Sequence, residues 1–322
     1  MSRQFRVLVA ALAALFLGLT VAACGAPTAE SSDGPMVSIT DAQDRTVQVP
    51  LNPTRVVATD WSAVRTLTAL GVPVAGVPEP NGSLPDDLAS LAGDGTPKVG
   101  GLKDLDYEAI SELDPDLVVV GSRSGTPEVI AEISKITPNV VDMSVRATDP
   151  ARIVDEIRTR VTDLGSIFGK TDRATALMDD ASARVDEVRA RVEQAGRTAM
   201  FVQVSGGKVS AYGPGSRFGI IYGAFGFRPT DAPVQDGGSH GEEISQEFFT
   251  RYNPGTLFVL DRGRAVGETG APALDVLDNG LVGNTAAARD GKIVGVDGFA
   301  WYLATGDPVS LGRMSDDVAS SL

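Results

Sequence analysis

From Val37 onward, short apolar runs alternate with longer stretches in which apolar residues recur at helical spacing. This alternation is typical of α/β proteins, in which helices join the strands of a mostly parallel sheet. The pattern predicts short helices over residues 63–70, closed by Gly71, and over residues 108–113. It predicts strands over residues 55–59, 72–77, 117–120, 199–204, 208–212 and 257–260.

Two long helices are predicted in the middle of the chain. The first begins at Asp149 and Pro150, an N-cap residue followed by a proline at the first helical position, where an N–H is not needed. The second covers residues 172–195 and ends at Gly196. The first keeps helical spacing through Ile153, Ile157, Val161, Leu164 and Phe168.

The length of 322 residues exceeds the usual size of one hydrophobic core. We therefore predict two α/β lobes after an N-terminal segment. The N-terminal lobe covers residues 37–148, a joining helix covers 149–168, and the C-terminal lobe covers 169–322.

One pattern occurs twice in the chain, once in each predicted lobe. In both copies a glutamate at a helix start precedes a proline by seven positions, and the proline precedes an arginine by eight. Ligands of open parallel sheets bind beyond the carboxyl ends of the strands, so two facing lobes would direct both arginines into one cleft. The two copies are Glu108, Pro115 and Arg123, and Glu247, Pro254 and Arg262.

The N-terminus predicts export. Residues 1–23 have a basic start, an uncharged apolar run and small residues at the end, as in a secretory signal peptide. The sequence around Cys24 resembles the lipobox of bacterial lipoproteins, although an ordinary buried thiol is the alternative. Residues 24–36 would form a flexible tether, and a lipid on Cys24 would hold the protein at the outer face of the cytoplasmic membrane. The sequence leaves open whether that face borders a Gram-positive surface or a periplasm.

Charge and composition exclude several classes. The formal charge of −14 becomes −16 without residues 1–23, which contain Arg3, Arg6 and no acidic residue, and this excludes a general nucleic-acid binder. The negative net charge still allows a local arginine cluster that binds a small anion. One cysteine cannot form an internal disulfide, so the core alone must stabilise the fold.

Four longer motifs identify a family resemblance. They are KVSAYGPGSRFGIIY at 208–222, SHGEEISQEF at 239–248, VLDRGRAVGE at 259–268 and WYLATGD at 301–307. Together they resemble the ABC-importer binding proteins for catecholate siderophores of the petrobactin and enterobactin type, from about Val47 to the C-terminus. The resemblance implies two Rossmann-like lobes joined by one long rigid helix, the class III periplasmic binding protein fold, with a small hinge motion on binding.

The resemblance also implies a binding site. Three arginines in the cleft, here Arg123, Arg217 and Arg262, face the anionic ferric complex. His240 and Tyr302 match residues that complete the iron coordination when the siderophore offers only four oxygens. Guanidinium groups suit a multiply charged anion because they stay protonated, and ferric iron accepts phenolate and imidazole ligands.

Further expectations concern these residues and their partners. Arg217 lies at the start of a predicted helix after a Gly-Pro-Gly turn, where backbone N–H groups would assist it. Glu108 and Glu247 match the family's residues that dock onto the permease, although favourable charge at a helix N-terminus explains them equally well. We expect a monomer with no intrinsic cofactor, whose ligand is an Fe(III)–siderophore complex. The resemblance is loosest between Glu79 and Lys103.

Three other functions are less compatible with the sequence. A secreted hydrolase would have to centre on His240, the only histidine, but no G-x-S-x-G turn precedes it. Haem, cobalamin or a hydroxamate siderophore would need fewer compensating cations than three arginines supply. A purely structural lipoprotein would have no use for an arginine-lined cleft. The choice between tetradentate and hexadentate cargo stays open.

Overall fold

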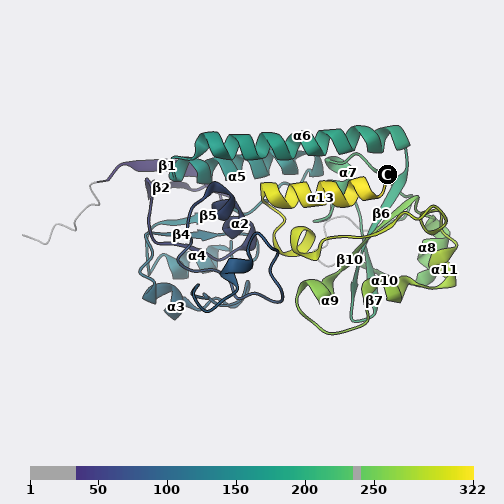
Figure 1. Ribbon diagram of the computed structural model, residues 1–322, viewed down its shortest axis with the longest axis horizontal. Coiled ribbons are helices and arrows are strands. Elements are labelled where there is room, and N and C mark those ends of the chain that lie inside the picture. The colour runs from purple at the N-terminus through teal and green to yellow at the C-terminus, as the bar shows by residue number, and fades with distance from the viewer. Residues whose placement is uncertain (1–33, 235–240) are drawn as a thin grey trace, which may run out of the picture. The chain divides into compact units, whose positions relative to one another are not determined.

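The computed structural model describes residues 34–234 and 241–322 (Figure 1). The predicted signal peptide, Cys24, most of the predicted tether and His240 therefore lie outside the described residues. The first strand begins at Met36, inside the predicted 24–36 tether.

The N-terminal lobe is built around a three-stranded parallel sheet in the order β3-β4-β5. Every residue of its strands is buried, as expected for a parallel sheet covered on both faces. A separate hairpin of β1 (Met36–Thr40) and β2 (Thr46–Pro50) precedes it. The lobe's elements are β3 (Val56–Ala58), α2 (Trp61–Leu70), η1 (Ala89–Leu91), α3 (Tyr107–Glu112), β4 (Leu117–Val120), α4 (Pro127–Ile133) and β5 (Val140–Asp142).

The C-terminal lobe is built around a six-stranded mixed sheet in the order β11-β10-β6-β7-β9, with β8 also pairing with β6. The central pairs β6–β10 and β10–β11 are parallel, whereas β7 is antiparallel to both of its neighbours. Its strands are β6 (Thr198–Ser205), β7 (Lys208–Tyr212), β8 (Arg228–Pro229), β9 (Glu242–Ile244), β10 (Thr256–Asp261) and β11 (Ile293–Gly295). Its helices are α7 (Ile220–Gly223), α8 (Gln246–Tyr252), α9 (Arg262–Ala265), α10 (Ala273–Leu277), α11 (Gly280–Gly283), α12 (Ala286–Arg289), η3 (Phe299–Leu303) and α13 (Pro308–Ser320).

Two helices follow the N-terminal lobe in the chain, and the second of them is the long helix that runs along both lobes. The predicted 149–168 helix begins as a 3₁₀ turn, η2 (Pro150–Arg152), with Asp149 as its N-cap, and continues as α5 (Ile153–Ile167). The 25-residue α6 (Thr171–Ala195) packs antiparallel to α5, and Figure 1 shows it running alongside both lobes. The close turn between them requires Gly165, where a Cβ would lie 2.6 Å from that of Ala174.

Most of the predicted helices and strands form, because the regularly spaced apolar residues that predicted them are buried in the core. Residues 117–120 and 208–212 are strands with the predicted bounds, and Gly71 and Gly196 end their helices in the left-handed conformation. The strand predicted over 72–77 was wrong. Only isolated bridges from Gly76 and Val77 occur there, since that segment runs past the edge of β3 without a full ladder.

A buried arginine joins the N-terminal helix α2 to the C-terminal helix α13. Arg65 is 2% exposed; it forms an ion pair with Asp87 at 2.7 Å and donates to Ser310 Oγ at 3.2 Å. Asp307, the N-cap of α13, accepts from the Ser310 N–H at 2.8 Å and from its hydroxyl at 2.6 Å. The start of α13 is thus held by charged groups from both lobes.

We expect the protein to become more stable as the pH falls from 7.5 to 5.5. Burial raises the pKa of Asp307 to about 7 and that of Asp60 to about 6, both from 3.8. Between about pH 4 and 7 the folded state therefore binds more protons than the unfolded state, so acidification adds about 2 kcal/mol to the free energy of unfolding. Asp87, whose pKa is lowered by its hydrogen bond from Arg65, stays ionised in this window and does not offset the gain.

Urea denaturation at the two pH values measures this effect. Asp307→Asn should remove more than half of the gain, whereas Asp316→Asn, which changes an exposed carboxyl on the same helix, should leave it intact. An equal gain in the wild type and in Asp307→Asn would contradict the assignment.

Candidate functional site

Three arginines from separate parts of the chain converge on Tyr302. Arg123 follows β4, Arg262 follows β10 as the first residue of α9, and Arg217 lies in the loop after β7. Tyr302 belongs to η3, a single π-helical turn, a conformation often found at functional sites. The structure thus brings together four of the five residues predicted to bind the ligand.

The backbone and ring of Tyr302 both hold the arginines in place. The Tyr302 carbonyl oxygen accepts from Nη2 of Arg123 at 3.3 Å and from Nη2 of Arg217 at 3.2 Å. The guanidinium carbons of Arg123 and Arg217 lie 4.8 and 4.7 Å from the centre of the Tyr302 ring, within the range of cation–π contact. Arg262 hydrogen-bonds the Tyr302 side chain and forms an ion pair with Glu268.

The three positive charges change the acidity of the tyrosine. Burial acts to raise the pKa of Tyr302, but the hydrogen bond from Arg262 and the charges of Arg123 and Arg217 outweigh it, and the pKa is lowered from 10. The phenolate is therefore more accessible here than in an ordinary tyrosine.

One hydrogen-bond donor of Arg123 has no acceptor among the described residues. Its Nη1 atom is buried, and no described residue accepts a hydrogen bond from it. One carboxylate oxygen of Asp60, the N-cap of α2, is likewise buried without a partner. Burial raises the pKa of Asp60 to about 6, although backbone N–H groups and the charge of Arg123 act in the opposite direction. A buried donor without a partner is unfavourable, so this site is prepared for an acceptor.

Arg123 and Arg217 line a cavity of about 700 Å³, a size typical of small-molecule sites. Ser122, Val145 and Thr148 line it from the N-terminal lobe, and the 215–220 segment lines it from the C-terminal lobe. Trp301, Thr305 and Met314 complete its wall. A ligand in this cavity contacts both lobes at once.

The repeated pattern of the sequence explains how two of the arginines are placed. In each copy a short helix with the glutamate in its first turn ends before a proline, and a buried parallel strand follows. The residue before each proline, Asp114 or Asn253, takes a left-handed backbone conformation with φ of 43° or 39°. The same turn therefore starts each strand, and an arginine follows each strand at its carboxyl end.

The other predicted site residues have different positions. Glu108 and Glu247 are exposed, in the first turns of α3 and α8. The helix expected to begin at Arg217 starts only at Ile220 and has four residues, so Arg217 lies in a turn and receives no help from a long helix. His240 lies outside the described residues. In the part of the chain that is described, no group of three or more His, Cys, Asp and Glu side chains could hold a metal ion.

Sequence reasoning missed three features near this site. Asp60 and Arg65 belong to no recognisable motif, and their burial, which makes them notable, becomes visible only in the folded chain. Arg264 was visible in the VLDRGRAVGE motif, two residues after Arg262, but nothing in the sequence separated its role from that of Arg262.

None of the helices in residues 34–234 and 241–322 is long and apolar enough to cross a membrane.

Comparison with known proteins identifies the family. The periplasmic binding protein family matches residues 56–298. The chain is 32% identical to the petrobactin-binding protein YclQ of Bacillus subtilis, covering 96% of each chain. It is 34% identical to the ferric-anguibactin-binding protein FatB of Vibrio anguillarum, covering 83% of this chain and 81% of that one.

Solved structures agree with this assignment. The catecholate-siderophore binding protein VctP of Vibrio cholerae matches with a TM-score of 0.81 and 29% identity, over 89% of this chain and all of that one. This confirms the predicted class III periplasmic binding fold, and the prediction of a binding protein rather than a hydrolase agrees with the family. The chain belongs to the periplasmic binding protein family and is an extracytoplasmic solute-binding protein.

Proposed function

We propose that the protein binds a ferric catecholate siderophore outside the cytoplasmic membrane and delivers it to an ABC importer. The observation that carries the proposal is the convergence of Arg123, Arg217 and Arg262 on Tyr302 beside a cavity shared by both lobes. The names of the relatives, petrobactin-binding and ferric-anguibactin-binding, support a siderophore as the cargo.

The charge of the site supports a catecholate rather than a hydroxamate. Like charges at close range oppose each other, so holding Arg123 beside Arg217 is unfavourable until an anion arrives. A ferric catecholate carries several negative charges and offers oxygen pairs that match the planar guanidinium groups. The buried Nη1 atom of Arg123 gains an acceptor when such a ligand binds.

We further propose that Tyr302 and His240 bind the iron when the siderophore leaves coordination positions open. The lowered pKa of Tyr302 supports this role, because a phenolate is the form that ferric iron binds. Gly241, the residue after His240, packs against the ring of Tyr212, where a Cβ would lie 2.7 Å from a ring carbon. Tyr212 interacts electrostatically with Arg217 and Tyr302, so the chain next to His240 passes close to the arginine cluster.

Tyr302→Phe is expected to weaken a tetradentate ferric complex at least tenfold and a hexadentate complex by less than threefold, since only the former leaves iron positions for the phenolate. His240→Ala should show the same selectivity. The measurement is tryptophan fluorescence quenching, with the ligand-to-metal absorption band followed in parallel. Equal losses for the two complexes would remove the coordination role, and Tyr252→Phe, on the distant helix α8, serves as the matched control.

Delivery requires an anchor and a docking surface. We propose that lipid on Cys24 keeps the monomeric protein at the membrane and that Glu108 and Glu247 dock onto basic residues of the permease. Each glutamate is exposed and lies at the start of a helix whose following strand leads to a site arginine. One repeated unit in each lobe would then contact the ligand at one end and the permease at the other.

A further inference from the structure

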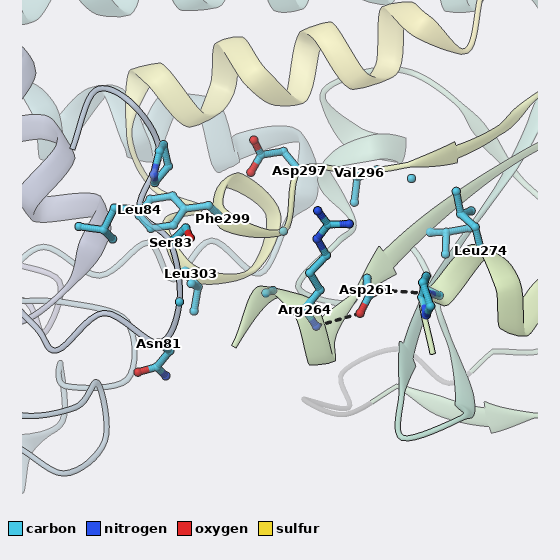
Figure 2. A pocket seen from close by; sticks show the side chains of 18 of the residues that line it. Asn81, Ser83, Leu84, Asp261, Arg264, Leu274, Val296, Asp297, Phe299 and Leu303 are labelled. Carbon is cyan, nitrogen blue, oxygen red and sulfur yellow. Dashed lines mark hydrogen bonds between the residues drawn. The ribbon is translucent and has the colours of Figure 1, made fainter. Parts of the chain in front are cut away.

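A second chamber adjoins the arginine cluster. It has a volume of about 640 Å³ and is distinct from the cavity of Arg123 and Arg217 (Figure 2). Leu303, the residue after Tyr302, lines it, and so does Arg264, two residues after Arg262. Its apolar wall includes Leu84, Val259, Leu274, Val296, Phe299 and Leu303.

The loop of residues 81–85 forms the N-terminal lobe's side of the chamber. This loop belongs to the 79–103 segment, where the resemblance to catecholate-binding proteins is loosest. The 81–85 side of the chamber therefore lies in the segment that resembles the family least, whereas the arginine cluster lies in segments that match it. Binding loops on a shared scaffold commonly set the differences in specificity between relatives.

The two lobes touch at the edge of the chamber. Gly267 has a φ of 74°, and a Cβ on it would lie 2.1 Å from the carbonyl oxygen of Asn81. Only glycine allows this approach. The 81–85 loop is thus held against the C-terminal lobe, and the chamber has a fixed boundary there.

Arg264 and Asp297 provide opposite charges inside the chamber. Figure 2 shows the Arg264 side chain extending into the chamber on the side of Asp297. No ion pair joins them, and within the described ranges the Arg264 guanidinium has no hydrogen-bond acceptor. Asp297 accepts from the Ala300 N–H through one oxygen only. Both oxygens of Asp261, which also lines the chamber, already accept from the backbone N–H groups of Arg264 and Ala273.

Arg264, Asp297 and the apolar wall determine which ligand group fits the chamber. A donor side chain and an acceptor side chain, separated from each other on an apolar wall, match a group that both accepts and donates, and a secondary amide does so without net charge. A simple anion would meet the carboxylate of Asp297, and a simple cation would meet Arg264. A neutral amide in an apolar chain avoids both conflicts.

We propose that this chamber binds the iron-free linker of the siderophore, with Arg264 donating to a linker amide carbonyl and the amide N–H donating to Asp297. The proposal rests on the proposed function and adds to it a substrate class, siderophores with amide-containing linkers. The arginine cluster then recognises the ferric centre, and the chamber selects among siderophores that share that centre.

Two synthetic ferric bis-catecholates of equal length test the proposal, one with a central secondary amide in its linker and one with methylene groups in its place. The wild type should bind the amide probe about tenfold more tightly, the effect of one hydrogen bond to a charged group. Arg264→Met should lower the ratio of the two affinities at least threefold while changing the affinity for the methylene probe less than about twofold. Arg191→Met, which changes an exposed arginine on α6, should keep the wild-type ratio.

The outcomes separate this inference from the proposed function. An unchanged ratio in Arg264→Met, or an equal loss for both probes, overturns the linker site while leaving ferric catecholate binding in place. Failure of the wild-type protein to bind either probe overturns the proposed function, and the linker site with it.

Discussion

Replacing Arg123 and Arg217 together with methionine is expected to reduce the affinity for an anionic ferric catecholate about a thousandfold, because each guanidinium supplies a charge-assisted hydrogen bond. The same double variant should fold at least as stably as the wild type. Both side chains hydrogen-bond the Tyr302 carbonyl oxygen and lie against the Tyr302 ring, and their removal exchanges these contacts for relief of the repulsion between two adjacent cations. Fluorescence titration and thermal unfolding of the domain that begins after Cys24 measure the two effects.

The matched control is Arg191→Met with Arg251→Met, which removes the same charge from exposed positions on α6 and α8. Its affinity should stay within about twofold of the wild type, since exposed charges far from a site are screened by salt. If the control loses as much affinity as Arg123→Met with Arg217→Met, net charge rather than the cluster determines binding. A loss of less than tenfold in the cluster variant would contradict the site itself.

Replacing Glu108 and Glu247 together with glutamine is expected to abolish siderophore-dependent iron uptake while leaving the affinity for the ferric siderophore unchanged. Both carboxylates are exposed in helices that precede the strands, whereas the site arginines follow the carboxyl ends of those strands, so the cleft should not respond. Each substitution removes a favourable charge at a helix N-terminus, which at an exposed position lowers stability only slightly. Uptake of labelled iron by cells that carry only the variant, together with titration of the purified protein, gives the two readings.

Glu128→Gln with Glu187→Gln provides the control. Glu128 occupies the first turn of α4, a position equivalent to that of Glu108 in α3, and Glu187 is exposed on α6. This control should take up iron normally. Normal uptake by Glu108→Gln with Glu247→Gln would leave these residues with only their helix-terminal role.

The sequence predicted the parts of the site that depend on local pattern. Arg123 and Arg262 could be placed at strand ends because a helix, a proline turn and a buried strand precede each one at fixed spacing. The equal spacing places both arginines alike because both turns have the same backbone conformation, with Asp114 and Asn253 in the left-handed region. Arg217 and Tyr302 were found only through the family resemblance.

What the sequence could not supply are properties of contacts between distant segments. The pairing of α5 with α6 depends on side-chain packing such as that of Gly165 on Ala174, and periodicity alone does not say which long helix spans the lobes. The burial of Arg65 and Asp60 arises from tertiary packing, which reverses the usual expectation that charged residues are exposed. The segment 72–77 has the composition of a strand, but whether a strand forms depends on an available partner edge.

The contact between Gly267 and Asn81 determines how the lobes are able to move. Because backbone atoms of the two lobes already touch at this edge, further approach there is blocked, and a closing rotation would have to pivot about this edge. A closing rotation about that pivot displaces the lobes most at points remote from Gly267. Under the proposed docking through Glu108 and Glu247, a permease would then distinguish the loaded from the empty protein by the spacing of these two residues, and a bulkier residue at position 267 would shift that spacing before any ligand is bound.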